Sequence, residues 1–410
     1  IPTMPCSFIA VMCCRLSRSA SKPPCTFGCR VLTRPSIISG NPVKEATSIT
    51  TRPASRRALA DPPVDNNSTP RSASARPSSS KPVLSDTEIS ARLSSTSCVI
   101  SNPTDMPKAI FISAFKSGPL AIDNDFALYG MDELFQLGLD FISKLTNGLL
   151  HLNLDGNTNS SRVFTHAKGV EINKFSGPHP AGNVGVQVHH LDPINKGDVI
   201  WYLEPQDVIA IARLFSEGKY DVSRIIAMCG SQVKKPRYYR TLAGTSISNF
   251  ISDNVNGDNN RIICGDVLSG SKINADGYLG FYDTQLSIIK EGNQQEFLGW
   301  MLPGFNKFSL SKSYFSWLFP KKRYDIDTNM RGEERAYVVT GQYEKVLPMD
   351  LYPQQLIKAI MIEDIDLMEK LGLYEVAPED LALCEFVCTS KIEVQSIIRH
   401  GLDLLRKENL

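Results

Sequence analysis

Between residues 108 and 230, short apolar stretches alternate with segments of helical spacing, and this alternation constrains the fold more than any other feature of the sequence. Four stretches have the length and composition of buried strands: 108–115, 149–154, 199–203 and 224–230. A strand–helix–strand order favours a parallel sheet covered by helices. We therefore predict a Rossmann-like α/β domain over residues 99–236.

Two helices of that domain can be placed from their spacing. The first covers residues 132–145, with Asp132 as its expected N-cap, and the second begins at Pro205, a favoured residue in a first turn. The faces expected to pack on the sheet are Leu134, Leu137, Phe141 and Leu145 in the first helix, and Val208, Ile211, Ala212 and Phe215 in the second.

The pattern changes after residue 236. Strand-like runs, a Gly-Thr turn and a short helix with Ser246 as its candidate cap suit a β-grasp domain over residues 237–345. A helix over residues 353–372 and an amphipathic helix near the C-terminus favour a helical domain over residues 346–410. The expected fold class is α/β plus α+β in several domains, which suits a chain of 410 residues because one core rarely grows past ~300.

The N-terminal region, residues 1–98, has a different composition. The first hundred residues contain 19 Ser, 12 Pro and two Phe, with neither Tyr nor Trp. Such a segment buries too little apolar area to offset a chain entropy of ~1–2 kcal/mol per residue, so we expect low-complexity, irregular structure. Three interpretations stay open: a basic arm, a segment without selected structure, and a shifted reading frame, which we favour.

The charge of the remaining chain bears on its partners. Residues 101–410 carry 31 Lys and Arg against 38 Asp and Glu. A mildly acidic body argues against nucleic acid as a partner, because phosphate binding needs a basic face. Neither a run of 18 apolar residues nor the charge order of a signal peptide occurs, so we predict neither a membrane span nor a leader.

The most distinctive loop, residues 175–198, spaces Gly177, Gly182 and Gly185 as G-x4-G-x2-G. Glycine lets backbone amides approach a ligand closely, and such amides favour anions or carbonyl oxygens. Two interpretations stay open, a ligand-binding loop and a structural turn between two strands. The spacing is not the G-x-G-x-x-G of a dinucleotide site.

The histidines and cysteines do not form a metal pattern. His189 and His190 are adjacent, so on a strand they would point to opposite faces, and with His179 they are better explained as ordinary hydrogen-bonded side chains. Cys384 and Cys388 are spaced C-x3-C, too few for an iron–sulfur cluster, and we expect buried thiols. We assign neither a metal ligand nor a catalytic residue.

Residues 304–325 concentrate aromatic side chains, among them Phe305, Phe308 and Trp317, beside a basic triplet at 321–323. This combination is typical of a membrane interface or of a docking surface on a membrane partner. It is equally typical of a buried hairpin with a solvated basic turn, and both interpretations stay open.

Longer segments match a known family in order across roughly residues 99–410. They include "NPTDMPKAIFISAF", "GPHPAGNVGVQVHHLDPINKGDVIWYLEPQDV", "CGDVLSG", "GWMLPGFNKFS" and "MRGEERAYVVTGQYEKVLPMDLYPQQLIKAIMIEDIDLMEKLGL". These segments resemble the A subunit of the sodium-translocating NADH:quinone reductases. The resemblance implies a Rossmann-like domain, a β-grasp domain of the soluble-ligand-binding (SLBB) type and C-terminal helices.

The same resemblance implies a peripheral subunit on the cytoplasmic face of the bacterial inner membrane, in a six-subunit complex that oxidises NADH and exports sodium. It implies docking on the membrane-embedded B subunit, with ubiquinone as substrate. No flavin or iron–sulfur cluster is expected in this subunit, whereas FAD, FMN and a 2Fe-2S centre are expected in its partners. For quinone binding we select Gly177, His179, Gly182, Gly185, Phe305, Phe308 and Trp317, for backbone access and apolar surface.

One departure keeps alternatives open. Members of this family begin with a small β-rich domain resembling a lipoyl carrier, and residues 1–98 lack its alternating strands. Beside the pump subunit we therefore retain two alternatives: a free-standing β-grasp protein that binds a small ligand, and the defective product of a frameshifted gene.

Overall fold

The computed structural model describes residues 106–293, 296–299, 302, 304–310, 312–319 and 321–408. The predictions made for residues 1–98 lie outside these ranges. Within them, two sheets and a group of C-terminal helices each have a hydrophobic core of their own.

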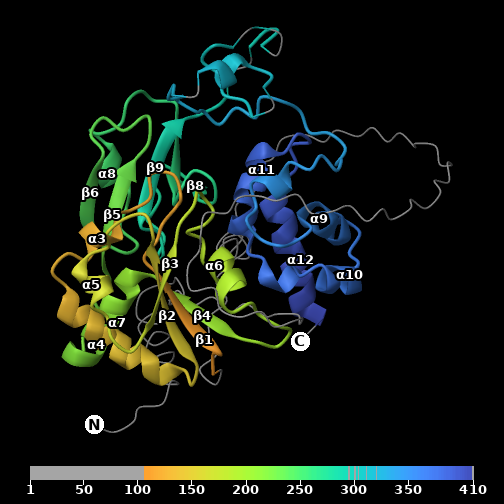
Figure 1. Cartoon of the computed structure of the whole chain (residues 1–410). Coiled ribbons are helices and arrows are strands. Elements are labelled where there is room, and N and C mark those ends of the chain that lie inside the picture. Colours follow the sequence, from red (N-terminus) through yellow and green to blue (C-terminus); the bar gives the residue numbers. More distant parts are fainter. Residues whose placement is uncertain are drawn as a thin grey trace, which may run out of the picture. The chain divides into compact units, whose positions relative to one another are not determined.

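The first sheet has four strands in the order β3-β2-β1-β4, and all its pairings are parallel. Its strands are β1 (Ala109–Ser113), β2 (Leu149–Asp155), β3 (Glu171–Phe175) and β4 (Ile200–Leu203). The helices between and after them are α3 (Asn124–Ala127), α4 (Asp132–Ile142), η1 (Ser143–Leu145), α5 (Arg162–Thr165), α6 (Val184–Leu191) and α7 (Pro205–Glu217). The predicted Rossmann-like domain is confirmed (Figure 1).

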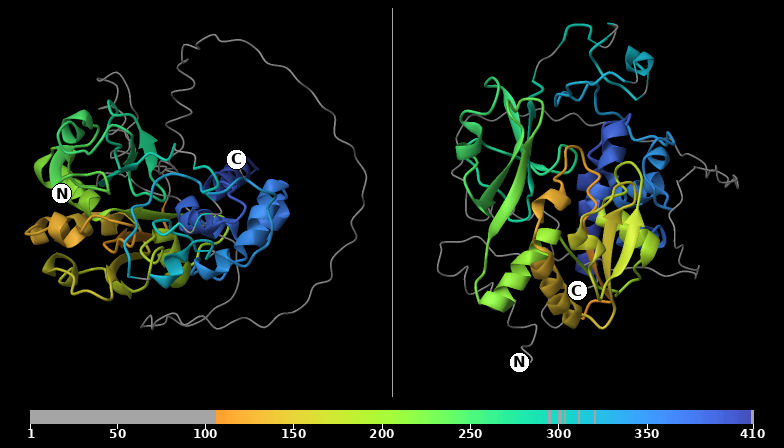
Figure 2. Two further views of the ribbon diagram at one scale, coloured as in Figure 1. Left: turned by 90° about the horizontal axis from the view of Figure 1, so that it is seen from above. Right: turned by 60° about the vertical axis from the view of Figure 1, so that its left-hand side comes forward.

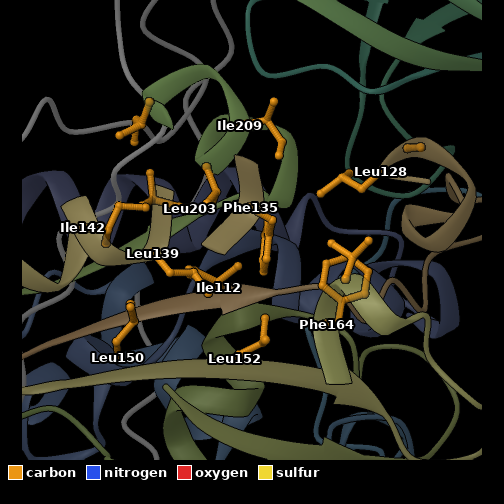
Figure 3. Close-up of a cluster of buried hydrophobic side chains, with 14 of the residues drawn as sticks. Ile112, Leu128, Phe135, Leu139, Ile142, Leu150, Leu152, Phe164, Leu203 and Ile209 are labelled. Carbon is orange, nitrogen blue, oxygen red and sulfur yellow. The ribbon is translucent and has the colours of Figure 1, made fainter. Parts of the chain in front are cut away.

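Both faces of the first sheet are covered. Along β1, Ile110 and Ile112 join the core beneath α4 and α7, whereas Phe111 packs on the opposite face with Val188 of α6. Figure 3 shows the first of these cores, and α4 and α7 lie side by side in Figure 2. Burial on both faces explains why the stretch is continuously apolar rather than alternating.

Helix α4 differs from the prediction in its cap and in its buried face. Its N-cap is Met131, which makes no side-chain cap bond, and Asp132 is the first helical residue. The buried face contains Phe135, Leu139 and Ile142, and Leu134, Leu137, Phe141 and Leu145 are only half-buried. The reason is Gly138: a Cβ there would overlap the Val208 carbonyl, so close packing on α7 sets the rotation of α4. On α7, Phe215 is exposed although Val208, Ile211 and Ala212 are buried as predicted.

The second sheet is mixed, in the order β6-β5-β9-β7-β8, and confirms the predicted α+β domain. Its elements are β5 (Ser223–Cys229), β6 (Arg237–Leu242), α8 (Ser248–Ile251), β7 (Asn260–Cys264), β8 (Ser271–Ile273) and β9 (Gln285–Lys290). The N-cap of α8 is Ile247 and not Ser246, whose hydroxyl lies 2.9 Å from Ser248 Oγ.

The prediction that residues 224–230 form the fourth strand of the first sheet is wrong. These residues form β5, which pairs antiparallel with β6 and parallel with β9. The fourth strand is β3, an edge strand whose side chains are mostly exposed, so it carries no apolar pattern that would reveal it. The chain passes from the first sheet to the second between Glu217, the end of α7, and Ser223, the start of β5.

The C-terminal helices share a third core. They are η3 (Tyr343–Lys345), α9 (Pro353–Met361), α10 (Ile365–Lys370), η4 (Leu373–Glu375), η5 (Pro378–Leu381), α11 (Ala382–Val387) and α12 (Val394–Glu408). The single helix predicted over 353–372 is in fact two, because Glu363 has a φ of 57° and Asp364 caps α10 by accepting from the Leu367 amide at 3.0 Å. Among the described residues, no helix combines the length and the apolar character that crossing a membrane requires.

Candidate functional site

The strand order of the first sheet points to one edge as a ligand-binding position. Strand β1 is flanked by β2 on one side and by β4 on the other, so the order reverses between β1 and β4. In open α/β sheets, ligands bind outside the carboxyl ends of the strands at such a reversal. The loop after β1 and the start of α7 lie at this edge.

A partly buried ion pair joins these two elements. Lys116, which follows β1, pairs with Glu204, the N-cap residue of α7. Burial alone would lower the pKa of Lys116, but the carboxylate of Glu204 raises it, so the lysine stays charged at neutral pH. The pair supplies no free charge to a ligand, and it fastens the two elements together at the edge.

The loop after β3 is anchored to the same edge through Ser117. The hydroxyl of Ser117 accepts from the amide of Gly182 at 2.7 Å and lies 3.1 Å from Nδ1 of His179. If the hydroxyl donates to Nδ1, the neutral ring carries its proton on Nε2. Burial lowers the pKa of His179, against the opposing effect of Asp266, which favours this neutral ring. A proton on Nε2 is then available to an acceptor atom of a ligand.

The selected glycines are held by close packing. A Cβ at Gly182 would overlap the backbone nitrogen of Ser117, and one at Gly185 would overlap the carboxylate of Asp380. Gly177 has a φ of 147°, which favours glycine. The segment joins β3 to α6, so it connects a strand to a helix rather than two strands, and the close packing of its glycines agrees with the structural interpretation.

A polar network beneath α6 supports the loop. Asn153, fully buried on β2, donates to Oε1 of Gln187 on α6 at 2.8 Å, and it accepts from Asn173 on β3 at 3.2 Å. Gln187 in turn donates to the carbonyl of Ala181 at 3.5 Å. Satisfied buried amides fix the positions of the groups that they join, so this network ties the loop to the sheet.

Helix α6 also joins the first sheet to the C-terminal helices. His189 Nδ1 lies 2.7 Å from Glu375 Oε2, and its Nε2 accepts from the Asp350 amide at 3.2 Å. His190 Nε2 lies 2.8 Å from the Pro348 carbonyl. The two histidines lie on a helix rather than on a strand, but the prediction of ordinary hydrogen-bonded side chains is confirmed.

Residues 296–323 contain the aromatic side chains and the basic triplet of the predicted stretch 304–325 and are here called the aromatic–basic segment; where the structure describes them, they are largely exposed. Phe305 is 58% exposed and Trp317 is 52% exposed. Phe308 is also exposed, and its ring stacks on that of Phe386 of α11 with 6.3 Å between the ring centroids. Among the described aromatic residues of this segment, Tyr314 is buried, and Lys307 Nζ lies 5.3 Å from its ring centroid. The alternative of a buried hairpin is therefore wrong: the side chains lack a core to cover them within the described residues.

The structure does not bring the two selected groups into contact in the parts of the chain that it describes. Instead, the glycine loop and the aromatic–basic segment each contact the stretch formed by η5 and α11. Asn183 of the loop donates to Asp380 of η5 at 3.1 Å, and Phe308 stacks on Phe386 of α11. Sequence reasoning missed Lys116, Ser117 and Asp380, although polar residues directly after a parallel strand are a usable signal for the first two.

Cys384 and Cys388 are free and buried, as predicted. Burial raises the pKa of Cys384 to about 12, so its thiol is neutral and unreactive at physiological pH. In the described ranges, no group of three or more His, Cys, Asp or Glu side chains is arranged to hold a metal ion.

Two models of known protein families match this chain, one over the first sheet and one over part of the second. Residues 98–220 match the family model described as "NqrA second alpha/beta domain", and residues 225–275 match "NQRA C-terminal domain", an SLBB model. The NAD+-reducing [NiFe]-hydrogenase in its air-oxidized state is similar at a TM-score of 0.33 and 13% identity, over 46% of this chain and 41% of that one, which supports no conclusion.

Curated relatives match about three quarters of the chain. The A subunit of the Na(+)-translocating NADH-quinone reductase of Pasteurella multocida is 39% identical over 303 residues, 74% of this chain and 67% of the relative. The corresponding protein of Alcanivorax borkumensis is 40% identical over 310 residues, 75% of this chain and 68% of the relative. The chain thus belongs to the family of A subunits of the Na(+)-translocating NADH-quinone reductases.

Proposed function

We propose that this chain docks on the membrane-embedded B subunit through the aromatic–basic segment, on the cytoplasmic face of the inner membrane, and that it contributes to ubiquinone binding. The exposure of that segment carries the proposal. Phe297 is 89% exposed, and Leu302, Leu310, Leu318 and Phe319 are exposed beside Phe305 and Trp317. A contiguous run of exposed apolar side chains marks an interaction surface.

The chemistry of the segment favours a partner at a membrane. Lys321, Lys322 and Arg323 follow the aromatic side chains directly and are exposed. Aromatic side chains beside basic ones suit the boundary between a membrane protein and its anionic lipid surface. The membrane-embedded partner would cover the apolar side chains, and the basic triplet would face lipid headgroups.

For quinone, the loop supplies a donor and the segment an apolar surface. His179 Nε2–H would donate to a quinone carbonyl oxygen, while Phe308 and Trp317 would contact the ring or the isoprenoid chain. The contact of Asn183 with Asp380 and the stacking of Phe308 on Phe386 join both groups to one short segment. Electrons would come from flavins (FAD, FMN) and a 2Fe-2S centre in partner subunits, so no nucleophile is needed here.

Quinone binding can be tested on the full chain by quenching of tryptophan fluorescence with a short-chain ubiquinone. We expect saturable quenching and a roughly tenfold weaker affinity for His179→Gln, because one hydrogen bond contributes about 1–1.5 kcal/mol. His166→Gln is the matched control, since His166 is exposed and lies on another loop. Equal affinity of both variants and the wild type would remove His179 from the site.

Docking can be tested by recovery of the full chain with membranes that contain the other subunits. Replacing Phe305 and Trp317 with Ser should lower recovery at least tenfold, because it removes apolar area from the surface. Leu242→Ser on β6, an equally exposed apolar position outside the segment, should leave recovery unchanged. Loss of recovery in the control alone would place the docking surface elsewhere.

A further inference from the structure

A small cavity lies between α7 and the strands β5 and β6, and none of the residues proposed to bind quinone lines it. It measures ≈ 30 Å³, and three arginines line it: Arg213 from α7, Arg224 from β5 and Arg240 from β6. A second cavity of ≈ 10 Å³ is lined by Arg224, Tyr220 and Phe281. The lining of the first cavity thus combines three arginines with one carboxylate, that of Asp221.

Arg224 has an unused hydrogen-bond donor. The side chain is only 6% exposed, and its Nη2 donates to Asp207 Oδ1. The other oxygen of Asp207 accepts from the Glu204 amide at 3.3 Å, which completes the capping box of α7. Both oxygens of Asp207 thus accept a hydrogen bond, and Arg224 Nη1 is buried without a hydrogen-bond partner among the described residues. A buried donor of a charged group without an acceptor is costly, and such groups are rare in folded proteins.

The guanidinium keeps its charge at this place. Burial alone would lower the pKa of Arg224, but Asp207 raises it. The group also lies 5.0 Å from the ring centroid of Phe281, a distance at which the ring attracts a cation. An acceptor placed at the cavity would therefore meet a permanent positive charge.

The charges around the cavity do not cancel. Arg224 pairs with Asp207, and Arg213 pairs with Asp221. Arg240 is exposed and has no ion-pair partner in the described part of the chain. The cavity therefore carries one uncompensated positive charge, which favours a small anion over a neutral or cationic ligand.

We propose that this cavity binds a small oxyanion, either inorganic phosphate or the carboxylate of a small acid, which accepts from the Arg224 guanidinium and pairs with Arg240. A cavity of ≈ 30 Å³ has room for about two water-sized groups, so a nucleotide does not fit and a small oxyanion enters only if the side chains around it move apart. Because Nη1 is covered, binding includes a small displacement of side chains at the cavity rim. Since α7 covers the first sheet and β5 and β6 belong to the second, the bound anion would couple the two domains.

The test is thermal unfolding of the full chain with increasing sodium phosphate or sodium acetate, at constant ionic strength set with sodium chloride. A ligand that binds only the folded state raises Tm in a saturable way. We expect this with at least one of the two anions, and the two arms identify which. Neither anion raising Tm beyond chloride would overturn the proposal.

The variant Arg240→Gln should weaken the apparent affinity about tenfold, and because Arg240 is exposed it should leave the fold intact. Arg237→Gln is its matched control, since Arg237 lies on the same strand, is exposed and does not line the cavity. Arg224→Gln would be a poor test, because it leaves Asp207 buried without its ion pair. An identical anion response of Arg240→Gln and the wild type would also overturn the proposal.

Discussion

The loop at Gly177–Gly185 and the aromatic–basic segment both have an unusual composition, but the physical reasons for it are opposite. The loop contains small residues because its surroundings leave no room for side chains, and a Cβ at Gly182 or Gly185 would overlap its neighbours. The segment contains large residues that the described structure leaves uncovered, such as Phe305 and Trp317. The difference teaches that an unusual composition marks a constraint from inside the fold in the first case, and side chains that this fold leaves exposed in the second, which is the observation on which the proposed docking rests.

The claim that close packing excludes side chains from the loop can be tested most strongly at Gly185. Gly185→Val would place a branched side chain on the carboxylate of Asp380, which also caps the Ala377 amide at 3.1 Å. We expect the free energy of unfolding to fall by about 3 kcal/mol. Denaturant titration measures this. Gly118→Ala is the control, because its added Cβ would lie 3.6 Å from Asp266 Oδ2, an ordinary contact, and should change stability little.

A second test concerns the support of the loop. Asn153→Ala removes the donor to Gln187 and leaves the buried amide of Gln187 and the half-buried amide of Asn173 with fewer partners. Removing one member of a buried polar network should cost about 2 kcal/mol, which denaturant titration can measure. A change below about 0.5 kcal/mol would mean that the network does not hold the loop. Asn157→Ala, on an exposed turn after β2, serves as the control.

Glu291 follows β9 at the end of the second sheet, next to the aromatic–basic segment, and makes the stability of this region depend on pH. Hydrogen bonds from Arg261, Lys272 and Thr328 lower the pKa of Glu291 to about 2. A lowered folded-state pKa gives stability that is present above the unfolded value near 4.5 and is lost as the pH falls towards 2.

Glu291→Gln should therefore lower the free energy of unfolding by about 1–2 kcal/mol at pH 7, allowing for screening by solvent. The difference from the wild type should shrink steadily between pH 4.5 and 2. Urea titrations at a series of pH values measure it. A difference independent of pH would show that the charge of Glu291 does not matter.

The smallest effect on stability is expected in the aromatic–basic segment, where the side chains are exposed. Trp317→Ser in the exposed segment should change the free energy of unfolding by less than about 0.5 kcal/mol, because little area is buried around it. Thermal or denaturant unfolding of the full chain checks this. A loss near 2 kcal/mol would show that the segment is part of the core and not a free surface.

Much of the fold can be predicted from the sequence, and each wrong prediction has a physical cause. Continuous apolar runs revealed β1, β2 and β4 because both faces of their sheet are buried. The polar edge strand β3 gave no such signal, and β5 was assigned to the wrong sheet because a buried strand shows its burial but not its neighbours. The single helix predicted over 353–372 failed at Glu363, where a positive φ breaks a pattern that remains helical on both sides.

The candidate site was less accessible to sequence reasoning. The glycine spacing indicated the loop, but the partners Ser117 and Asp380 lie 65 residues before Gly182 and 197 residues after Asn183. No local pattern reports a contact over such a separation. Polar residues at the end of a parallel strand would have indicated Ser117, whereas nothing in the sequence around Asp380 marks it as a neighbour of the loop.

The most direct test of the docking surface is the accessibility of Trp317 to acrylamide, before and after assembly with the membrane partners. The chain should carry Trp201→Phe and Trp300→Phe, so that Trp317 alone contributes its fluorescence. Trp317 is 52% exposed in the free chain and should be quenched readily. We predict that assembly reduces the quenching constant severalfold, because the membrane partner covers the aromatic–basic segment. Equal quenching of Trp317 in the free and the assembled chain would contradict the account.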